Sequence, residues 1–151
     1  MPKITRFADE LKNIHSGDAW HGPSLRETLN GVTAEQAIAR PVSGAHSIWE
    51  LVRHITVWEN VFRRKLQGDP VNEPEEGDFP IAKYPDQAAW RQALEILDQE
   101  HQLLIDTISS LDDAALDDLV PGKPYSISFL IEGLVRHHVY HSGQIAVLKK
   151  A

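Results

Sequence analysis

The sequence contains no cysteine among its 151 residues. This absence excludes a disulfide framework, a metal site built on thiolates and a cysteine nucleophile. Any transition-metal site must therefore use histidine and carboxylate side chains, and the chain has eight histidines.

Positive charge and long hydrophobic runs are also scarce. The chain has 15 Lys and Arg against 22 Asp and Glu, and its formal net charge is −7. Its one basic run, at 63–65, is interpreted as the solvated end of a helix, so no patch is predicted to neutralise nucleic-acid phosphates. No apolar stretch is long enough to span a bilayer, and the N-terminus has no signal core. We therefore expect a cytoplasmic protein with neither a nucleic-acid nor a membrane partner.

Apolar residues make up 42% and charged residues 25% of the chain, which is ordinary for a globular protein. The length predicts one domain over residues 1–151, with a core that needs no covalent support. Apolar residues recur at helical spacing, and no segment has the alternation of a strand. Long helices are predicted at 4–14, 46–66, 86–111 and 126–149, with short helical pieces between the first two and at 112–118.

Residues 68–85 interrupt this periodicity. The span holds four prolines, two glycines and several acids. It is too long for a tight hairpin between helices, so we expect it to cross the end or side of a bundle. The fold class predicted from these patterns is all-α.

Three histidines fall within five residues of the last predicted helix. His138 and His141 lie on its apolar stripe, and His137 lies at the edge of that stripe. His137 and His141 are four residues apart, which brings their Cβ atoms to about 5–6 Å, close enough to occupy adjacent positions on one cation. The spacing leaves two interpretations open: a metal-binding pair, or one buried histidine with two exposed ones.

Two further histidines lie on the stripes of other predicted helices. His54 flanks the stripe of 46–66 and, taken alone, is interpreted as a partly buried histidine bonded to a neighbour. On the same helix, Glu50, Arg53 and Glu59 are expected to point mostly away from the stripe. His101 lies near the centre of the stripe of 86–111.

Three segments together resemble the DinB/YfiT-like family of metal-dependent enzymes. They are WHGPSL at 20–25, HSIWELVRHI at 46–55 and HHVYHSGQI at 137–145, and the last is the most specific. The resemblance runs along nearly the whole chain. It implies that His54, His137 and His141 are metal ligands, and it assigns no role to His138. It also implies a four-helix bundle of up-down-down-up topology, with a long crossover between the second and third helices.

In that topology the three ligand histidines reach the same end of the bundle. His101 would lie roughly 10 Å from His54 along the axis, at 1.5 Å rise per residue, and is interpreted as a core histidine. The end of the first helix would bring His15, Trp20 and His21 toward the mouth of the site. They are candidates for lining a substrate pocket, although Trp20 is equally well explained as packing in the helix connection.

Three neutral imidazoles would leave one divalent transition-metal ion (Ni, Zn or Fe) with open coordination positions. The resemblance implies an enzyme, either a thiol-dependent S-transferase of the bacillithiol or mycothiol type or a hydrolase of a small molecule. The ion would lower the pKa of a thiol or of water. Gln144 is expected either to orient a ring or a water, or to bond between helices.

Two alternatives have no catalytic role. One is a metal-binding, stress-associated dimeric bundle, and the other is a plain bundle whose histidines are satisfied core residues. A homodimer is expected from the resemblance. Trp49, Phe79 and Tyr140 are the aromatic residues expected to be partly exposed.

Overall fold

The computed structural model describes residues 1–151 and contains helices but no strands. The all-α prediction is therefore confirmed. Each predicted long helix begins and ends within two residues of the observed boundaries. The elements are α1 (Lys3–Ser16), α2 (Leu25–Leu29), α3 (Ala34–Ile38), α4 (Ile48–Leu66), α5 (Gln87–Ser109), the 3₁₀ helix η1 (Asp113–Asp117) and α6 (Ile127–Lys150).

Polar residues fix where most of these helices begin. The side chains of Ser47, Asp86 and Ser126 each accept a hydrogen bond from the backbone N–H three residues later. Such a cap satisfies a donor that has no partner within the helix, which is why the predicted helix starts are close to the observed ones. Ser24 caps α2 in the same way, because its side chain accepts from the backbone N–H of Glu27.

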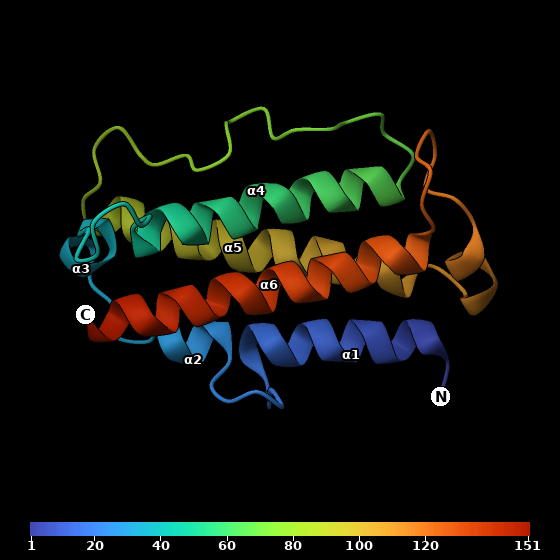
Figure 1. Ribbon diagram of the computed structural model, residues 1–151, viewed down its shortest axis with the longest axis horizontal. Helices are drawn as coiled ribbons and strands as arrows, with labels where there is room; N and C mark the ends of the chain where they lie inside the picture. The colour runs from blue at the N-terminus through green and yellow to red at the C-terminus, as the bar shows by residue number, and fades with distance from the viewer.

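The four long helices lie side by side along the longest axis. α4 packs against α5 and α6, and α1 contacts α5 and α6 from the other side. α1 and α6 run from right to left in Figure 1, whereas α4 and α5 run from left to right. None of these helices is both long and apolar enough to cross a membrane.

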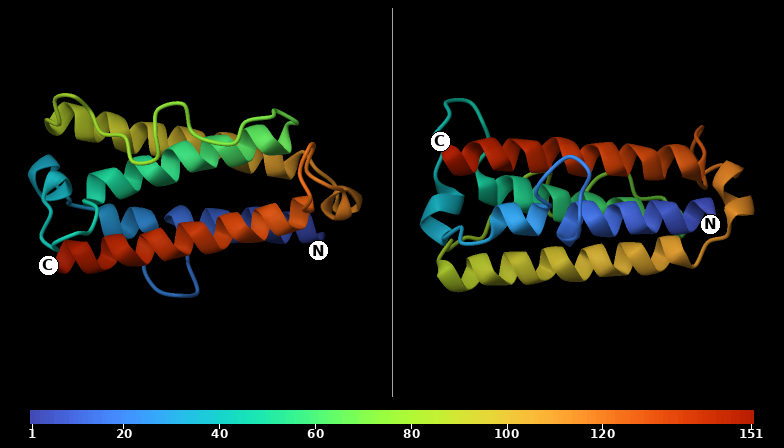
Figure 2. Two further views of the ribbon diagram at one scale, coloured as in Figure 1. Left: turned by 45° about the horizontal axis from the view of Figure 1, so that its top comes forward. Right: turned by 90° about the horizontal axis from the view of Figure 1, so that it is seen from below.

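Two irregular segments connect the helices (Figures 1 and 2). Residues 17–24 bulge away from the bundle between α1 and α2, and α2 then continues the row of α1. Residues 67–86 return along the outer side of α4 to the start of α5. The predicted crossover at 68–85 is thus irregular, and it runs along the side of the bundle.

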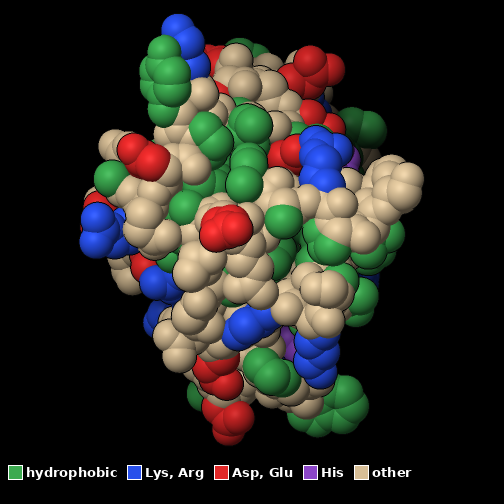
Figure 3. All heavy atoms as spheres, turned by 90° about the vertical axis from the view of Figure 1, so that its left-hand side faces the viewer, with side chains coloured by type: hydrophobic (Ala, Val, Ile, Leu, Met, Phe, Trp, Pro, Cys, Tyr) green, Lys and Arg blue, Asp and Glu red, His purple; other side chains and the backbone are tan.

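The apolar core is divided into two clusters of 15 buried residues each. One lies among α1, α6 and the C-terminal half of α5, and the other among α2, α3 and the N-terminal halves of α4 and α5. Polar residues separate the two clusters at the middle of the bundle: His15, His54, Glu59, His101, His138, His141 and Ser142. At the end that carries α3 and the C-terminus, histidine shows only as small patches of surface (Figure 3).

The exposure of the aromatic residues differs from the prediction at one position. Trp49 is only 1% exposed and packs against Trp90 within the second core cluster, so it is not available to a partner. Phe79 is partly buried, and Tyr140 on α6 is 65% exposed. The stripe of α4 is broader than predicted because this helix has neighbours on three sides.

Truncation of Leu134 tests the first core cluster. This residue is 1% exposed, and the change Leu134→Ala should lower the free energy of unfolding by about 2–5 kcal/mol because it leaves a cavity. Leu103→Ala is the matched control, since Leu103 is 48% exposed and should cost less than about 1 kcal/mol. Guanidinium unfolding measures both, and equal losses would contradict this description of the core.

Candidate metal centre

The structure brings together the three histidines that the sequence singled out. α4 positions His54, and α6 positions His137 and His141 one turn apart. One nitrogen from each ring lies within 4.8 Å of the others, and the Nε2 atoms of His54 and His137 are 3.0 Å apart. Two nitrogens bound to one cation at about 2.0–2.1 Å are separated by about 2.8–3.4 Å. The spacing of the His54 and His137 nitrogens therefore fits a shared metal ion.

The planes of these rings cross steeply. The interplanar angles are 44° between His54 and His137, 76° between His54 and His141, and 81° between His137 and His141. An imidazole lone pair lies in the plane of its ring, so steeply crossed rings can direct three lone pairs at one point. Stacked rings could not do so without rotating.

Hydrogen bonds hold two of the rings in one tautomer. The Nδ1 atom of His54 lies 2.8 Å from the carbonyl oxygen of Asp78 and 3.0 Å from its carboxylate. The Nδ1 atom of His141 lies 2.6 Å from the amide oxygen of Gln144. Since these partners accept hydrogen bonds, each Nδ1 carries the proton and each Nε2 keeps its lone pair. Metal-binding histidines in proteins are commonly held in this way.

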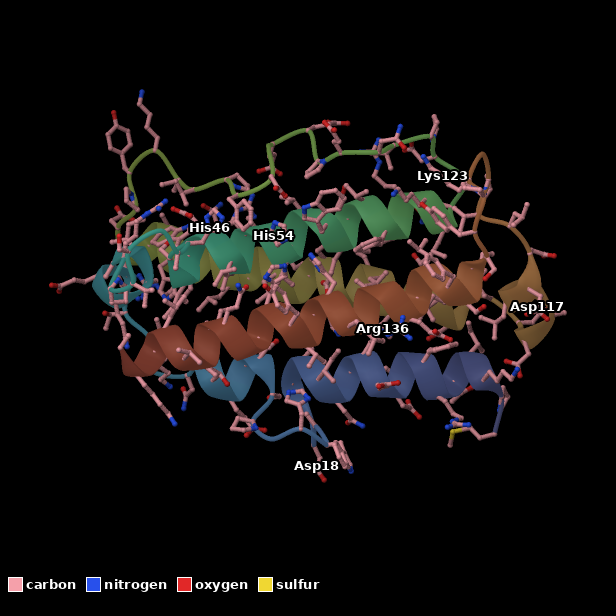
Figure 4. The ribbon with its side chains drawn as sticks, viewed as in Figure 1. Asp18, His46, His54, Asp117, Lys123 and Arg136 are labelled. Carbon is pink, nitrogen blue, oxygen red and sulfur yellow. The ribbon has the colours of Figure 1, made fainter.

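The crossover contributes residues to this site that the sequence analysis did not assign to it. Asp78 accepts from Nε1 of Trp58 at 2.6 Å as well as from His54. The ring of Phe79 is stacked between His54 and His46, with centroids 4.2 and 3.6 Å away. Figure 4 shows His54 near the middle of α4 beneath the crossover and His46 at the start of that helix. No periodicity marks Asp78 or Phe79, so the sequence pattern gave no signal for them.

Burial favours the neutral form of His137 and His141. Desolvation lowers the pKa of His137 to about 3, and the neighbouring rings of His141 and His54 act in the same direction. Desolvation also lowers the pKa of His141. Neutral imidazole is the form that binds metal ions, so these rings need not lose a proton first.

A second group of three histidines lies inside the bundle. His15 from α1, His101 from α5 and His138 from α6 are all buried, and one nitrogen from each lies within 4.8 Å of the others. His101 is a buried core residue, as predicted, but it is not isolated. The expectation that His15 lines the mouth of a pocket is wrong, because its ring faces the interior and stacks on His101. Trp20, at the bulge of 17–24, is fully exposed instead.

The burial of Glu59 also differs from the expectation. It was expected to point away from the apolar stripe of α4, yet it is 0% exposed. Its Oε1 atom lies 3.0 Å from Nδ1 of His101 and 3.8 Å from Nε2 of His138. The position of Glu59 follows from the packing of α4 against both α5 and α6, which buries a wider arc than one stripe.

Comparison with known proteins identifies one family. A model of the DinB superfamily matches residues 19–145, a range that includes His54, His137 and His141 but not His15. No curated protein and no solved structure shows significant similarity to the chain.

The lowered histidine pKa values predict how stability depends on pH. Burial lowers the pKa of His15, His137, His138 and His141 in the folded chain. Below about pH 6.5 the unfolded chain therefore binds protons that the folded chain does not, and the free energy of unfolding falls as the pH falls. Each such histidine contributes at most about 1.4 kcal/mol per pH unit.

Guanidinium unfolding in EDTA at pH 7, 6 and 5 measures this effect. The denaturation midpoint should decrease steadily as the pH falls. In His137→Gln it should decrease less, because the unfolded chain then binds about one proton fewer. A midpoint that does not change with pH would show that the histidines are not buried as described. Asp98 and Asp113 also have lowered pKa values, but they affect stability only at more acidic pH.

Proposed function

The chain belongs to the DinB superfamily, and from this membership we propose that it is a metal-dependent enzyme whose divalent ion is held by His54, His137 and His141. The observation that carries the proposal is the convergence of three rings, two of them fixed through Nδ1 by Asp78 and Gln144. The directions of the four long helices in Figure 1 also fit the up-down-down-up topology that the resemblance implies. Ni, Zn and Fe all suit such a ligand set.

The three proposed ligands favour a catalytic metal ion over a structural one. A divalent ion held by three neutral imidazoles keeps its full charge and open positions, and it lowers the pKa of a thiol or water beside it. His137 is partly exposed, so the site is reached from the surface beneath the crossover. A closed set of four protein ligands would leave no position for a substrate.

The nearby carboxylates favour a thiol over water as the nucleophile. Asp78 is occupied by His54 and Trp58, and Glu50 is paired with Arg40 and His46. No free carboxylate thus faces the cluster as a general base for hydrolysis. A thiol needs less help, because its own pKa is near 8.5. Of the two activities that the resemblance implies, we therefore propose an S-transferase that uses a low-molecular-weight thiol such as bacillithiol or mycothiol.

An open pocket of about 470 Å³ adjoins the proposed site. Its lining includes His46, Leu51, Gln144 and Leu148, and Gln144 is also the partner of His141. This mainly apolar surface suits an electrophilic small molecule. In the reaction the thiol sulfur forms a bond to the electrophilic carbon, the leaving group departs with its electron pair, and the thiol proton passes to solvent.

A homodimer remains a proposal drawn from the resemblance. Of the three aromatic residues named for it, Tyr140 is the one that is well exposed, on the outer face of α6. Trp49 contributes nothing to it because it is buried.

Conjugation of bacillithiol to monochlorobimane tests the proposed activity. Untagged protein is stripped with EDTA and reloaded separately with Ni²⁺, Zn²⁺ or Fe²⁺. At least one form should produce the fluorescent conjugate with release of chloride. His54→Ala should reduce the rate to the background without protein, and His21→Ala should not, because His21 is exposed, lies outside the cluster and, contrary to expectation, does not line the adjoining pocket.

Each other outcome favours a different function. No conjugation by any of the three metal forms would exclude the transferase on this substrate pair. Hydrolysis of a small ester by the loaded protein, lost in His54→Ala, would instead favour the hydrolase. One metal per chain with neither activity would favour a non-catalytic metal-binding bundle.

Gln144 should control metal affinity through His141. Gln144→Leu removes the acceptor that holds Nδ1 of His141, and losing such a partner typically weakens metal binding by about 10–100-fold. Competition with a zinc chelator measures the change. Gln102→Leu is the control, because Gln102 is exposed on α5 and bonds only to Asp106. Equal affinities in the two variants would mean that Gln144 does not orient the ligand.

A further inference from the structure

We propose that His15, His101 and His138, beside the buried carboxylate of Glu59, form a second metal site, separate from the one beneath the crossover. The four side chains come from α1, α5, α6 and α4, so the site would tie all four long helices together. Each residue is buried, and one nitrogen from each of the three rings lies within 4.8 Å of the others.

Each side chain of this cluster uses one polar atom in a hydrogen bond and leaves the other without a partner. Nε2 of His15 lies 2.8 Å from Oδ1 of Asp98, and Nδ1 of His101 lies 3.0 Å from Oε1 of Glu59. Nδ1 of His138 lies 3.3 Å from Oγ of Ser142. The remaining polar atoms are buried and bond to no other group of the protein: His15 Nδ1, His101 Nε2, His138 Nε2 and Glu59 Oε2.

Three of these unpartnered atoms are hydrogen-bond acceptors. The bonded nitrogens of His15 and His101 donate to carboxylates, so their unpartnered nitrogens carry lone pairs and can only accept. Oε2 of an ionised Glu59 is also an acceptor. A divalent cation held by one nitrogen from each of the three rings would satisfy the rings at once.

The charge of Glu59 supports the same conclusion. A buried carboxylate is stable only when it is paired and hydrogen-bonded. Glu59 is 0% exposed, and the basic side chains within 4 Å of its carboxylate are those of His101 and His138, with no lysine or arginine among them. A divalent cation would supply the missing positive charge and would occupy the nitrogens of the same rings.

Metal binding at this cluster would require one ring to change its orientation. His15 and His101 are stacked, with centroids 3.9 Å apart and an interplanar angle of 7°. His138 meets the two rings at 67° and 63°. Lone pairs in parallel planes do not meet, so one of the stacked rings must tilt about its Cβ–Cγ bond. His138 already has the steep angle that a shared ion requires.

The two clusters differ in burial and in position. His137 and His138 are consecutive on α6 and so point about 100° apart, one toward the crossover and the other into the bundle. The second cluster is fully buried and has a carboxylate beside it to balance the charge of an ion, whereas His137 of the first is partly exposed. The second site would therefore stabilise the fold and would not bind substrate.

Metal stoichiometry after refolding tests the proposal. Untagged protein is unfolded in guanidinium with EDTA, refolded with excess Zn²⁺, desalted and analysed for zinc per chain. Refolding gives the metal access to a site that is closed in the folded chain. The expected content is two for the wild type, one for His54→Ala/His141→Ala, one for Glu59→Gln/His101→Gln and none for the four substitutions combined.

Glu50→Gln is the matched control for Glu59→Gln. It makes the same chemical change at another buried glutamate of α4, one that lies outside both clusters, and should retain two zinc ions. Cobalt gives an independent reading: Co²⁺ bound by His54→Ala/His141→Ala should show visible absorption bands that differ from those of aqueous Co²⁺, because imidazole nitrogens replace water. Circular dichroism checks that each variant folds.

One zinc per chain in the wild type, with none in His54→Ala/His141→Ala, would overturn the proposal. Two zinc ions retained by Glu59→Gln/His101→Gln would also overturn the assignment of the ligands. If that variant does not fold, the comparison of wild type with His54→Ala/His141→Ala decides alone. Because the second site is measured where the first has been removed, loss of the transferase proposal would leave this result unchanged.

Discussion

The rest of the structure depends on a layer of buried polar groups at the middle of the helical bundle. Histidines and one glutamate from four helices occupy this level, and an apolar cluster lies on each side of it. Burying such groups costs free energy unless each finds a partner. The two apolar clusters offset that cost by holding the helices in register, so the polar side chains meet at one level.

The two halves of this layer differ in how fully their polar atoms are hydrogen-bonded. Beneath the crossover, the rings of His54, His137 and His141 cross steeply, and Asp78 and Gln144 hold the Nδ1 atoms of His54 and His141. In the interior, carboxylates hold one nitrogen each of His15 and His101, but the other nitrogen of each ring has no partner within the protein. The first half suits an ion with open positions, and the second suits an ion enclosed by protein.

Much of the fold could be predicted because its signals are local. Helical spacing and polar residues such as Ser47, Asp86 and Ser126 are read directly from the sequence, and they place the long helices within two residues. The two histidines of α6 that belong to the first cluster were found from their four-residue spacing. His54 lies far away in the sequence, and only the resemblance to a family joined it to them.

The residues that were missed depend on tertiary packing. Glu59 looks like a surface residue of α4 until α5 and α6 are both placed against that helix. Asp78 and Phe79 lie in a segment without periodicity, and only the path of the crossover brings them to His54. His15 seemed to lie at an open end, because the continuation of its row by α2 was not predicted.

The central claim is that three rings from two distant segments share one cation. Anomalous diffraction from a crystal grown with Zn²⁺ tests it most directly, because it locates the metal without assuming its ligands. We expect an anomalous peak about 2.0–2.1 Å from Nε2 of His54, His137 and His141. A crystal in which zinc binds elsewhere, with these three nitrogens left without metal, would contradict it.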